Sequence, residues 1–336
     1  MIFLNLQHSH TSKRHISLDF IKLFSAFVIV FYHLHEYMNL GSFVDGSYRI
    51  SITQIILALS PAAIPLFFVA NGALLLNKEY STEKMYTKAA KVALIILVWK
   101  IVDFPSWFME TLIILFLLYP ILNKLDKAKN KIWRNLVMLA LLVFPFIYNF
   151  VMVCFQCWWP DFSIVILGRT LSLETMPLKS GFYTLYSILY FLLGGIMFRK
   201  KINNIISTMS LLVGWILVIF DVIVSSNYSK IIQDTASSCI PTIGGLLITI
   251  GFFNLFRNLD KVKSEKFKSI ISKLGQYVMP IYLFHMHIIW KVFRPFFPSN
   301  VNVFLLLLCA IANYFVCIIL GMILKKIPLV KELLKM

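Results

Sequence analysis

The sequence predicts an all-α, polytopic bundle in a membrane, and three observations support that prediction. Of its 336 residues, 59% are hydrophobic and only 14% are charged. Soluble globular chains are about 45–50% apolar and about 25% charged. The mean hydropathy is +0.81. No polar block long enough to fold alone separates the apolar segments, so we expect one integral membrane domain.

A helix needs about 20 mostly apolar residues to cross the hydrocarbon core. On that length we expect about ten transmembrane helices, at 16–38, 51–76, 88–103, 107–123, 133–154, 181–198, 205–225, 236–256, 274–291 and 301–324. The third and fourth are short and close together, so a single broken hairpin is an alternative. The predicted domains are an N-terminal tail (1–15), the membrane domain (16–324) and a C-terminal tail (325–336).

The basic residues predict the orientation, because Lys and Arg gather in cytoplasmic loops. With the N-terminus inside, cytoplasmic segments hold 24 of the 32 basic residues. This predicts an even number of spans and two cytoplasmic termini. The same bias accounts for the net charge of +17, and no segment resembles a nucleic-acid-binding module. We therefore expect the lipid bilayer, and not nucleic acid, as a partner.

The first span carries charges that a purely structural helix does not need. Asp19 and Lys22 lie near its start at i, i+3 spacing, which allows them to pair. His33 and Glu36 have the same spacing near its end. Lys22 and His33 are about three turns apart on one face. Charged groups within a membrane usually face the bundle interior or a water-filled cavity.

Structural alternatives exist for both residues of this face. Lys22 could extend to the inner interface, and His33 could be a satisfied polar residue between helices. His35 lies about 200° round the helix from His33, so we expect it at the membrane interface.

Other polar residues fall at a similar depth to His33. Glu110 and Trp107 lie near the outer end of the fourth span, and His285 lies in the outer half of the ninth span. The gathering of these polar residues in the outer half of the bundle predicts a cavity open to the outside. No cysteine or histidine pattern indicates a metal site, and we expect none.

Lys88 and Lys91 mark the cytoplasmic start of the third span at i, i+3 spacing. We expect them to form one basic face. That face either sets the topology or clamps an anion, such as the phosphates of a nucleotide-type donor.

Four patches give the chain a resemblance to the acyltransferase-3 family of bacterial integral membrane acyltransferases. The first is Leu18, Asp19, Lys22 and His33, similar to the family's opening of Leu-Asp, a basic residue and then a His after ten residues. Lys22 stands where the family usually has Arg. The second is 63–72, AIPLFFVANG, in which Asn71 replaces a common Ser.

The third and fourth patches lie further along the chain. Lys88-x-x-Lys91 stands where the family often has two arginines, and it is followed by 106–108 and by Tyr119-Pro120-Ile121-Leu122. The segment 279–285, MPIYLFH, is similar to the family's Tyr-Leu-x-His near its end. The resemblance covers roughly 16–324.

The resemblance implies an O-acyltransferase in the bacterial plasma membrane. Its activity is transfer of an acyl group, commonly acetyl from acetyl-CoA, to a carbohydrate hydroxyl at the outer side. The acceptor is a cell-surface glycan or a lipid-linked sugar, and acyl-CoA is a substrate, with no bound cofactor.

The resemblance also implies roles for particular residues. His33 is the expected base or acyl carrier, and Glu36 or Glu110 would orient its imidazole. The residues expected to bind the acyl donor are Asp19, Lys22, Lys88 and Lys91. The residues expected to line the acceptor site are Trp107, Tyr282 and His285.

The sequence also permits a second class of function. Intramembrane acids and histidines also serve as proton relays, so a transporter or export component for a polysaccharide or lipid-linked sugar is the alternative. Transporters often show internal repeats, and we find none. The acyl group (acetyl or succinyl), the acceptor glycan and any homo-oligomeric state are not fixed by the sequence.

Overall fold

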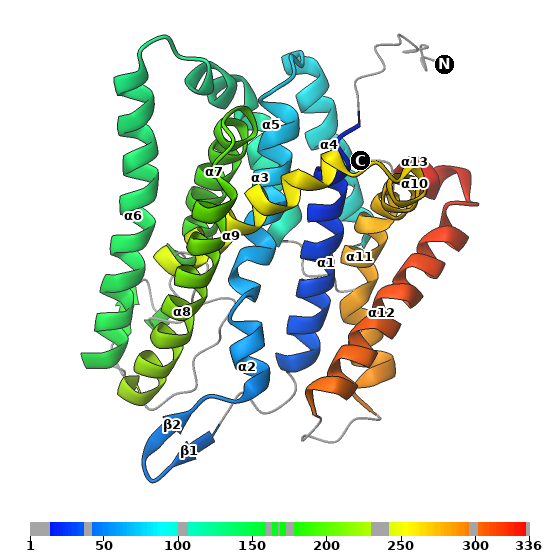
Figure 1. The fold of residues 1–336 in the computed structure, drawn as a ribbon. Helices are drawn as coiled ribbons and strands as arrows, with labels where there is room; N and C mark the ends of the chain where they lie inside the picture. The colour runs from blue at the N-terminus through cyan, green and yellow to red at the C-terminus, as the bar shows by residue number, and fades with distance from the viewer. Residues whose placement is uncertain are drawn as a thin grey trace.

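A computed structural model of the chain describes residues 14–36, 42–99, 107–158, 163–166, 169–172, 178–229, 242–295 and 302–333. They form a mostly helical bundle (Figure 1). The helices in chain order are α1 (Ile16–Glu36), α2 (Ile52–Leu57), α3 (Ala63–Leu75), α4 (Thr82–Trp99), α5 (Trp107–Asp126), α6 (Lys131–Trp158), α7 (Leu178–Arg199), α8 (Asn204–Ser229), α9 (Ile243–Phe256), α10 (Glu265–Leu274), α11 (Val278–Ile288), α12 (Val303–Leu324) and α13 (Pro328–Leu333).

Each segment predicted to span the membrane contains a helix in its described part. By length and composition, five helices of the described residues can cross a membrane: Ile16–Glu36, Ile52–Leu75, Trp107–Asp126, Asn204–Asn227 and Val303–Leu324. The second of these joins α2 to α3 through a 3-10 turn at Ser60–Ala62. A count of ten spans stays a prediction.

The outward faces of the bundle are apolar. Phe220 on α8 is 64% exposed and Phe304 on α12 is 67% exposed, and many aliphatic side chains on the same helices are also exposed. Soluble monomers rarely expose apolar patches of this extent, whereas lipid chains cover them in a membrane. Together with the spans, these faces indicate a membrane protein.

The start of α1 and the end of α12 lie at the same end of the bundle (Figure 1). Arg14 and Lys325 both donate hydrogen bonds to backbone carbonyls of one segment, at Ser272 and Gln276. We call this the basic end. The arrangement agrees with an even number of crossings, and the cytoplasmic location of this end stays a prediction. The predicted C-terminal tail contains the helix α13.

Helix α1 runs through the middle of the bundle, where it packs against α3, α9, α11 and α12. Asp260 fixes its start: the carboxylate accepts hydrogen bonds from the Ser17 backbone N–H (2.8 Å) and hydroxyl (2.9 Å). A carboxylate is favoured there because helix N-termini leave N–H groups unsatisfied. This cap holds the helix that carries Lys22 and His33.

Helices α3 and α7 touch through their backbones at two glycines. A Cβ at Gly72 would lie 1.8 Å from the Phe191 carbonyl oxygen, and a Cβ at Gly194 would lie 2.0 Å from the Val69 carbonyl oxygen. Small residues allow membrane helices to approach this closely. The contact sets the position of α3, which forms one wall of the site described below.

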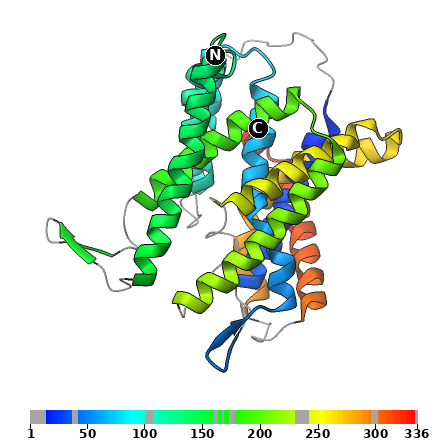
Figure 2. The same ribbon diagram turned by 60° about the vertical axis from the view of Figure 1, so that its left-hand side comes forward.

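The all-α prediction omits two short antiparallel hairpins. Strands β1 (Ser42–Val44) and β2 (Ser47–Arg49) are joined by Asp45 and Gly46, whose φ angles of 49° and 75° are typical of a type I′ turn. Strands β3 (Ser163–Ile166) and β4 (Arg169–Ser172) form the second hairpin, which projects from the bundle (Figure 2).

Candidate active site

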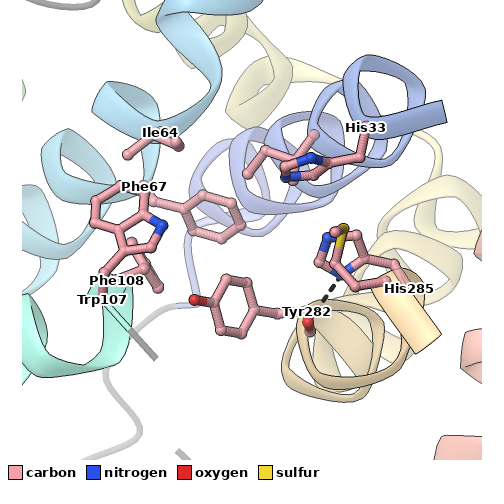
Figure 3. Close-up of a pocket in the computed structure, with 9 residues that line it drawn as sticks. His33, Ile64, Phe67, Trp107, Phe108, Tyr282 and His285 are labelled. Carbon is pink, nitrogen blue, oxygen red and sulfur yellow. Dashed lines mark hydrogen bonds between the residues drawn. The ribbon is translucent and has the colours of Figure 1, made fainter. Parts of the chain in front are cut away.

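A cavity of about 110 Å³ lies between α1, α3, α5 and α11 (Figure 3). It is lined by Ile29, His33, Ile64, Phe67, Trp107, Phe108, Tyr282, His285 and Met286. The lining is largely apolar, and its polar groups are two imidazoles, a phenol and an indole. Such a composition is typical of a small-molecule site, in which a few placed polar groups orient the ligand. His33, Trp107, Tyr282 and His285 were predicted to belong to one site, and the fold brings them together.

His33 forms the predicted pair with Glu36. The distance from His33 Nδ1 to Glu36 Oε2 is 3.0 Å. With Nδ1–H donating to the carboxylate, the lone pair of the neutral ring lies on Nε2. The side chain of His33 is 28% exposed and that of Glu36 is 46% exposed. The pair therefore combines a base with a carboxylate that orients it, at the edge of an apolar cavity.

His285 is the second imidazole of the cavity, and its ring centroid lies 5.4 Å from that of His33. Its Nδ1 donates to the carbonyl oxygens of Ile281 (3.0 Å) and Tyr282 (2.8 Å). This fixes the tautomer and leaves Nε2 as an acceptor. His285 is 3% exposed, and its Nε2 has no hydrogen-bond partner among the described residues.

Asn313 of α12 supports this arrangement from behind. Its Nδ2 donates to the His285 carbonyl oxygen at 3.1 Å, and Asn313 is fully buried. The contact joins α11 to α12 at the residue that carries the imidazole.

Aromatic side chains form the opposite wall. The ring of Phe108 packs on Tyr282, Phe67 and Phe68 at centroid distances of 5.1, 5.5 and 5.2 Å. The Tyr282 hydroxyl hydrogen-bonds with the Phe108 backbone and is within range of the Glu110 charge. Glu110 is exposed and does not line the cavity. Of the two carboxylates proposed for His33, the structure places Glu36 against the imidazole.

The predicted pair between Asp19 and Lys22 does not form. Asp19 binds the Arg14 guanidinium instead, with Nε to Oδ2 at 2.5 Å. The sequence reading was wrong here because a second cation, five residues upstream, competes for the same carboxylate. Lys22 makes no hydrogen bond or salt bridge with any residue that the structure describes, although the Asp19 charge is within range. A cation without a close partner inside the bundle is suited to an anionic ligand.

Lys88 belongs to the same group of cations as Lys22. It lies within electrostatic range of Lys22, Lys84, Lys78 and Lys91. Its ammonium also stacks over the rings of Tyr80 (5.2 Å) and Phe116 (5.9 Å). Lys88 is partly buried, whereas Lys91 is exposed. The i, i+3 spacing sets the two lysines about 60° apart round the helix, with Lys88 next to the buried side of α4 and Lys91 on its exposed side. Their charges remain within range of each other, and a shared basic face stays a prediction.

His35 is 2% exposed and is therefore buried, not interfacial. The apolar lining at Ile29, Ile64 and Phe67 was not predicted as part of the site. Its signal was present, since 63–72 is one of the four patches that carry the family resemblance. No group of three or more His, Cys, Asp or Glu side chains within the described residues could hold a metal ion.

The fold and the cavity define an integral membrane protein with an orientated histidine in an internal pocket. The family model Acyl_transf_3, described as an acyltransferase domain, matches residues 81–322. The chain therefore belongs to the acyltransferase-3 family and is a membrane acyltransferase. Comparison with curated proteins and with solved structures gave no significant match. The matched range contains Lys88 and His285 but starts after α1, so the role of His33 rests on its geometry.

Proposed function

We propose that this protein moves an acyl group, acetyl from acetyl-CoA, to a hydroxyl of a cell-surface glycan or lipid-linked sugar. His33 is the base or the acyl carrier of this reaction. The enzyme acts in the bacterial plasma membrane, with the basic end in the cytoplasm. The observation that carries the proposal is the His33–Glu36 pair at an apolar cavity that also contains a second, buried imidazole.

The reaction needs one proton acceptor, and His33 Nε2 supplies it. The acceptor hydroxyl oxygen attacks the thioester carbonyl, the new C–O bond forms, and the C–S bond breaks. The hydroxyl proton passes to His33 and then to the departing CoA thiolate, which leaves as the thiol. The Glu36 carboxylate stabilises the imidazolium that forms between these two proton transfers.

A second route uses His33 as a nucleophile. Its Nε2 attacks the thioester, the C–S bond breaks, and the acyl group rests on the imidazole until the acceptor hydroxyl takes it. CoA leaves as the thiol with a proton from solvent. When the acceptor oxygen takes the acyl group, the bond from the acyl carbon to Nε2 breaks and the hydroxyl proton is released to solvent. The two routes differ in whether an acylated histidine forms before the acceptor binds.

The donor is expected to enter from the basic end. Lys22 and Lys88 lie near each other there and suit the phosphates of CoA. Lys22 precedes His33 by eleven residues on the same helix, which is roughly 16 Å at the helical rise. A flexible pantetheine arm can follow α1 over this distance and bring the thioester to the cavity.

The acceptor is expected on the opposite side of the cavity. Trp107 and Tyr282 present an aromatic surface of the kind on which sugar rings pack, and His285 Nε2 can accept a hydrogen bond from a hydroxyl.

At the donor end, Asp19 is paired with Arg14, and its negative charge also partly offsets the positive charge of Lys22. A homo-oligomer is compatible with this scheme, since the cavity lies within one chain.

The test compares the O-acyl content of surface glycans from cells with no copy, the native protein and His33→Ala at matched membrane levels. We expect acyl groups only with the native protein. Equal acylation in all three strains, with altered glycan export, would instead support the transporter.

A further inference from the structure

A second, polar pocket lies at the basic end, away from the cavity of His33. It has a volume of about 470 Å³ and lies between the ends of α3, α5 and α7 and the start of α6. Its lining residues are Leu76, Asn77, Lys78, Glu79, Asp126, Lys127, Arg134 and Arg199. No role in the chemistry proposed above uses this pocket.

Two of its cations already have anionic partners. Arg199 binds the fully buried Asp126 carboxylate with both of its terminal nitrogens, at 2.8 and 2.6 Å. Lys127 lies 3.4 Å from Glu79. These pairs balance each other's charge and form part of the pocket wall, whose other cations are Lys78 and Arg134.

Arg134 is one of these other cations. Its Nε is buried and has no hydrogen-bond partner within the residues that the structure describes. A buried donor without a partner is costly, and such groups usually have an unseen partner. A guanidinium pairs best with the oxygens of a carboxylate or phosphate. The pocket therefore suits an oxyanion.

Lys78 connects this pocket to the donor cations described above. It lines the pocket, and its charge also acts on Lys88, which in turn lies within range of Lys22. The positive groups thus follow one another from Lys22 to Lys88, Lys78 and Arg134. Along α3, Leu76 of the pocket lies nine residues beyond Phe67 of the cavity, roughly 14 Å away.

We propose that this pocket binds the 3′-phosphate of the acyl-CoA donor. Acyl-CoA has its neutral thioester at one end, the negative diphosphate further along, and the negative 3′-phosphate near the other end. The protein offers groups in a matching order: first the cavity of His33, then Lys22 and Lys88, and finally Lys78 and Arg134. The inference rests on the proposed function, because it takes acyl-CoA as the donor.

The test compares acetyl-CoA with 3′-dephospho-acetyl-CoA as donors for the purified protein in neutral-lipid vesicles. For the native protein we expect KM to rise about tenfold without the 3′-phosphate, as for loss of a charged hydrogen bond. For Arg134→Gln, the two donors should have similar KM values with kcat unchanged. For Arg134→Lys, the ratio of the two KM values should lie between those of the native protein and Arg134→Gln, because lysine keeps the positive charge but lacks the planar guanidinium.

Lys131→Gln is the matched control. It removes one positive charge from the same end of α6, is exposed and does not line the pocket. It should keep the native ratio of KM values. If Arg134→Gln also keeps that ratio, the inference is wrong. A native protein that transfers no acyl group and binds no CoA would overturn the proposed function first.

Anionic lipid headgroups present the same phosphate chemistry. A parallel series in vesicles containing phosphatidylglycerol separates the two sources. If Arg134→Gln changes the dependence of activity on phosphatidylglycerol and leaves the KM ratio of the donors unchanged, the pocket binds lipid and the inference is overturned.

Discussion

At the scale of single residues, the chemistry depends on which atom of each imidazole holds a proton. Glu36 accepts from His33 Nδ1, and two backbone carbonyls accept from His285 Nδ1. Both rings therefore present Nε2 as an acceptor when neutral. His33 lies at the edge of the cavity with a carboxylate to stabilise its charged form, whereas His285 has only neutral carbonyls. This difference supports the proposed roles, in which His33 transfers the proton and His285 positions the hydroxyl.

Replacing Glu36 with Gln tests this division. The amide keeps a hydrogen bond to His33 but removes the negative charge that stabilises the imidazolium. We expect kcat to fall by about 10²-fold or more, as for loss of assistance to a general base, with little change in the donor's KM. The measurement is steady-state acyl transfer by purified protein. A fall confined to KM would show that Glu36 only shapes the donor site.

The two lysines of α4 provide a second residue-level prediction. Lys88→Gln should raise the donor's KM by about tenfold, because Lys88 is partly buried beside Lys22. Lys91→Gln is the matched control. It removes the same charge from a residue that is exposed and lies three positions after Lys88. Equal effects of the two substitutions would return both lysines to a role in topology.

Local spacing was a reliable guide to His33 and Glu36, because an i, i+3 pair on one helix depends on the helix alone. It failed for Asp19, where Arg14 outside the predicted span takes the carboxylate. It also could not reveal the bidentate pair of Asp126 and Arg199, which are 73 positions apart. Contacts of this kind depend on how α5 and α7 pack, and no short-range pattern encodes them.

At the scale of elements, the backbone contact between α3 and α7 holds one wall of the cavity. Ile64 and Phe67 line the cavity from α3, and Gly72 fixes the same helix against Phe191. The sequence located both helices by their hydropathy. Their partnership was not predictable, because hydropathy indicates that a helix is buried without indicating its neighbour.

Gly72→Ala is the corresponding prediction. Its new Cβ would meet backbone atoms, which cannot rotate away, so α3 and α7 must separate. We expect a loss of at least about 1–3 kcal/mol, seen as a lower melting temperature in detergent. Leu97→Ala on the exposed face of α4 is the control. A melting temperature equal to that of the native protein would show that the helices are not in contact at this point.

At the scale of the whole molecule, the chain returns to the end at which it starts. Arg14 and Lys325 bind the same short segment near α10 and α11. Two of the cation groups discussed above lie at this end, and the cavity of His33 lies toward the other. The acyl group would therefore have to cross part of the membrane to reach its acceptor.

The orientation can be tested with reporters at both termini. Fusions at Met1 and at Met336 should both give signal from a cytoplasmic reporter, because the basic residues favour that side. A cysteine introduced at Lys179 should react with an impermeant reagent in intact cells. Labelling only after permeabilisation, or opposite results for the two termini, would overturn the assigned orientation.

Hydropathy and charge predicted most of the whole-molecule organisation, including the helical class and the membrane. They did not predict the hairpins β1–β2 and β3–β4, which are short and lie in connecting segments. They also could not divide the apolar segments into those that cross fully and those that do not. Within the residues that the structure describes, five helices meet the length and composition of a span, and the full number of crossings stays a prediction.

The most direct test of the account is transfer by the purified protein in sealed vesicles. The vesicles contain radiolabelled acetyl-CoA, the basic end of the protein faces their interior, and a glycan acceptor is supplied outside. Native protein is compared with His33→Gln at equal amounts. We predict labelled glycan with the native protein and at least about 10²-fold less with His33→Gln. Equal labelling by both proteins would remove His33 from the chemistry and contradict the account.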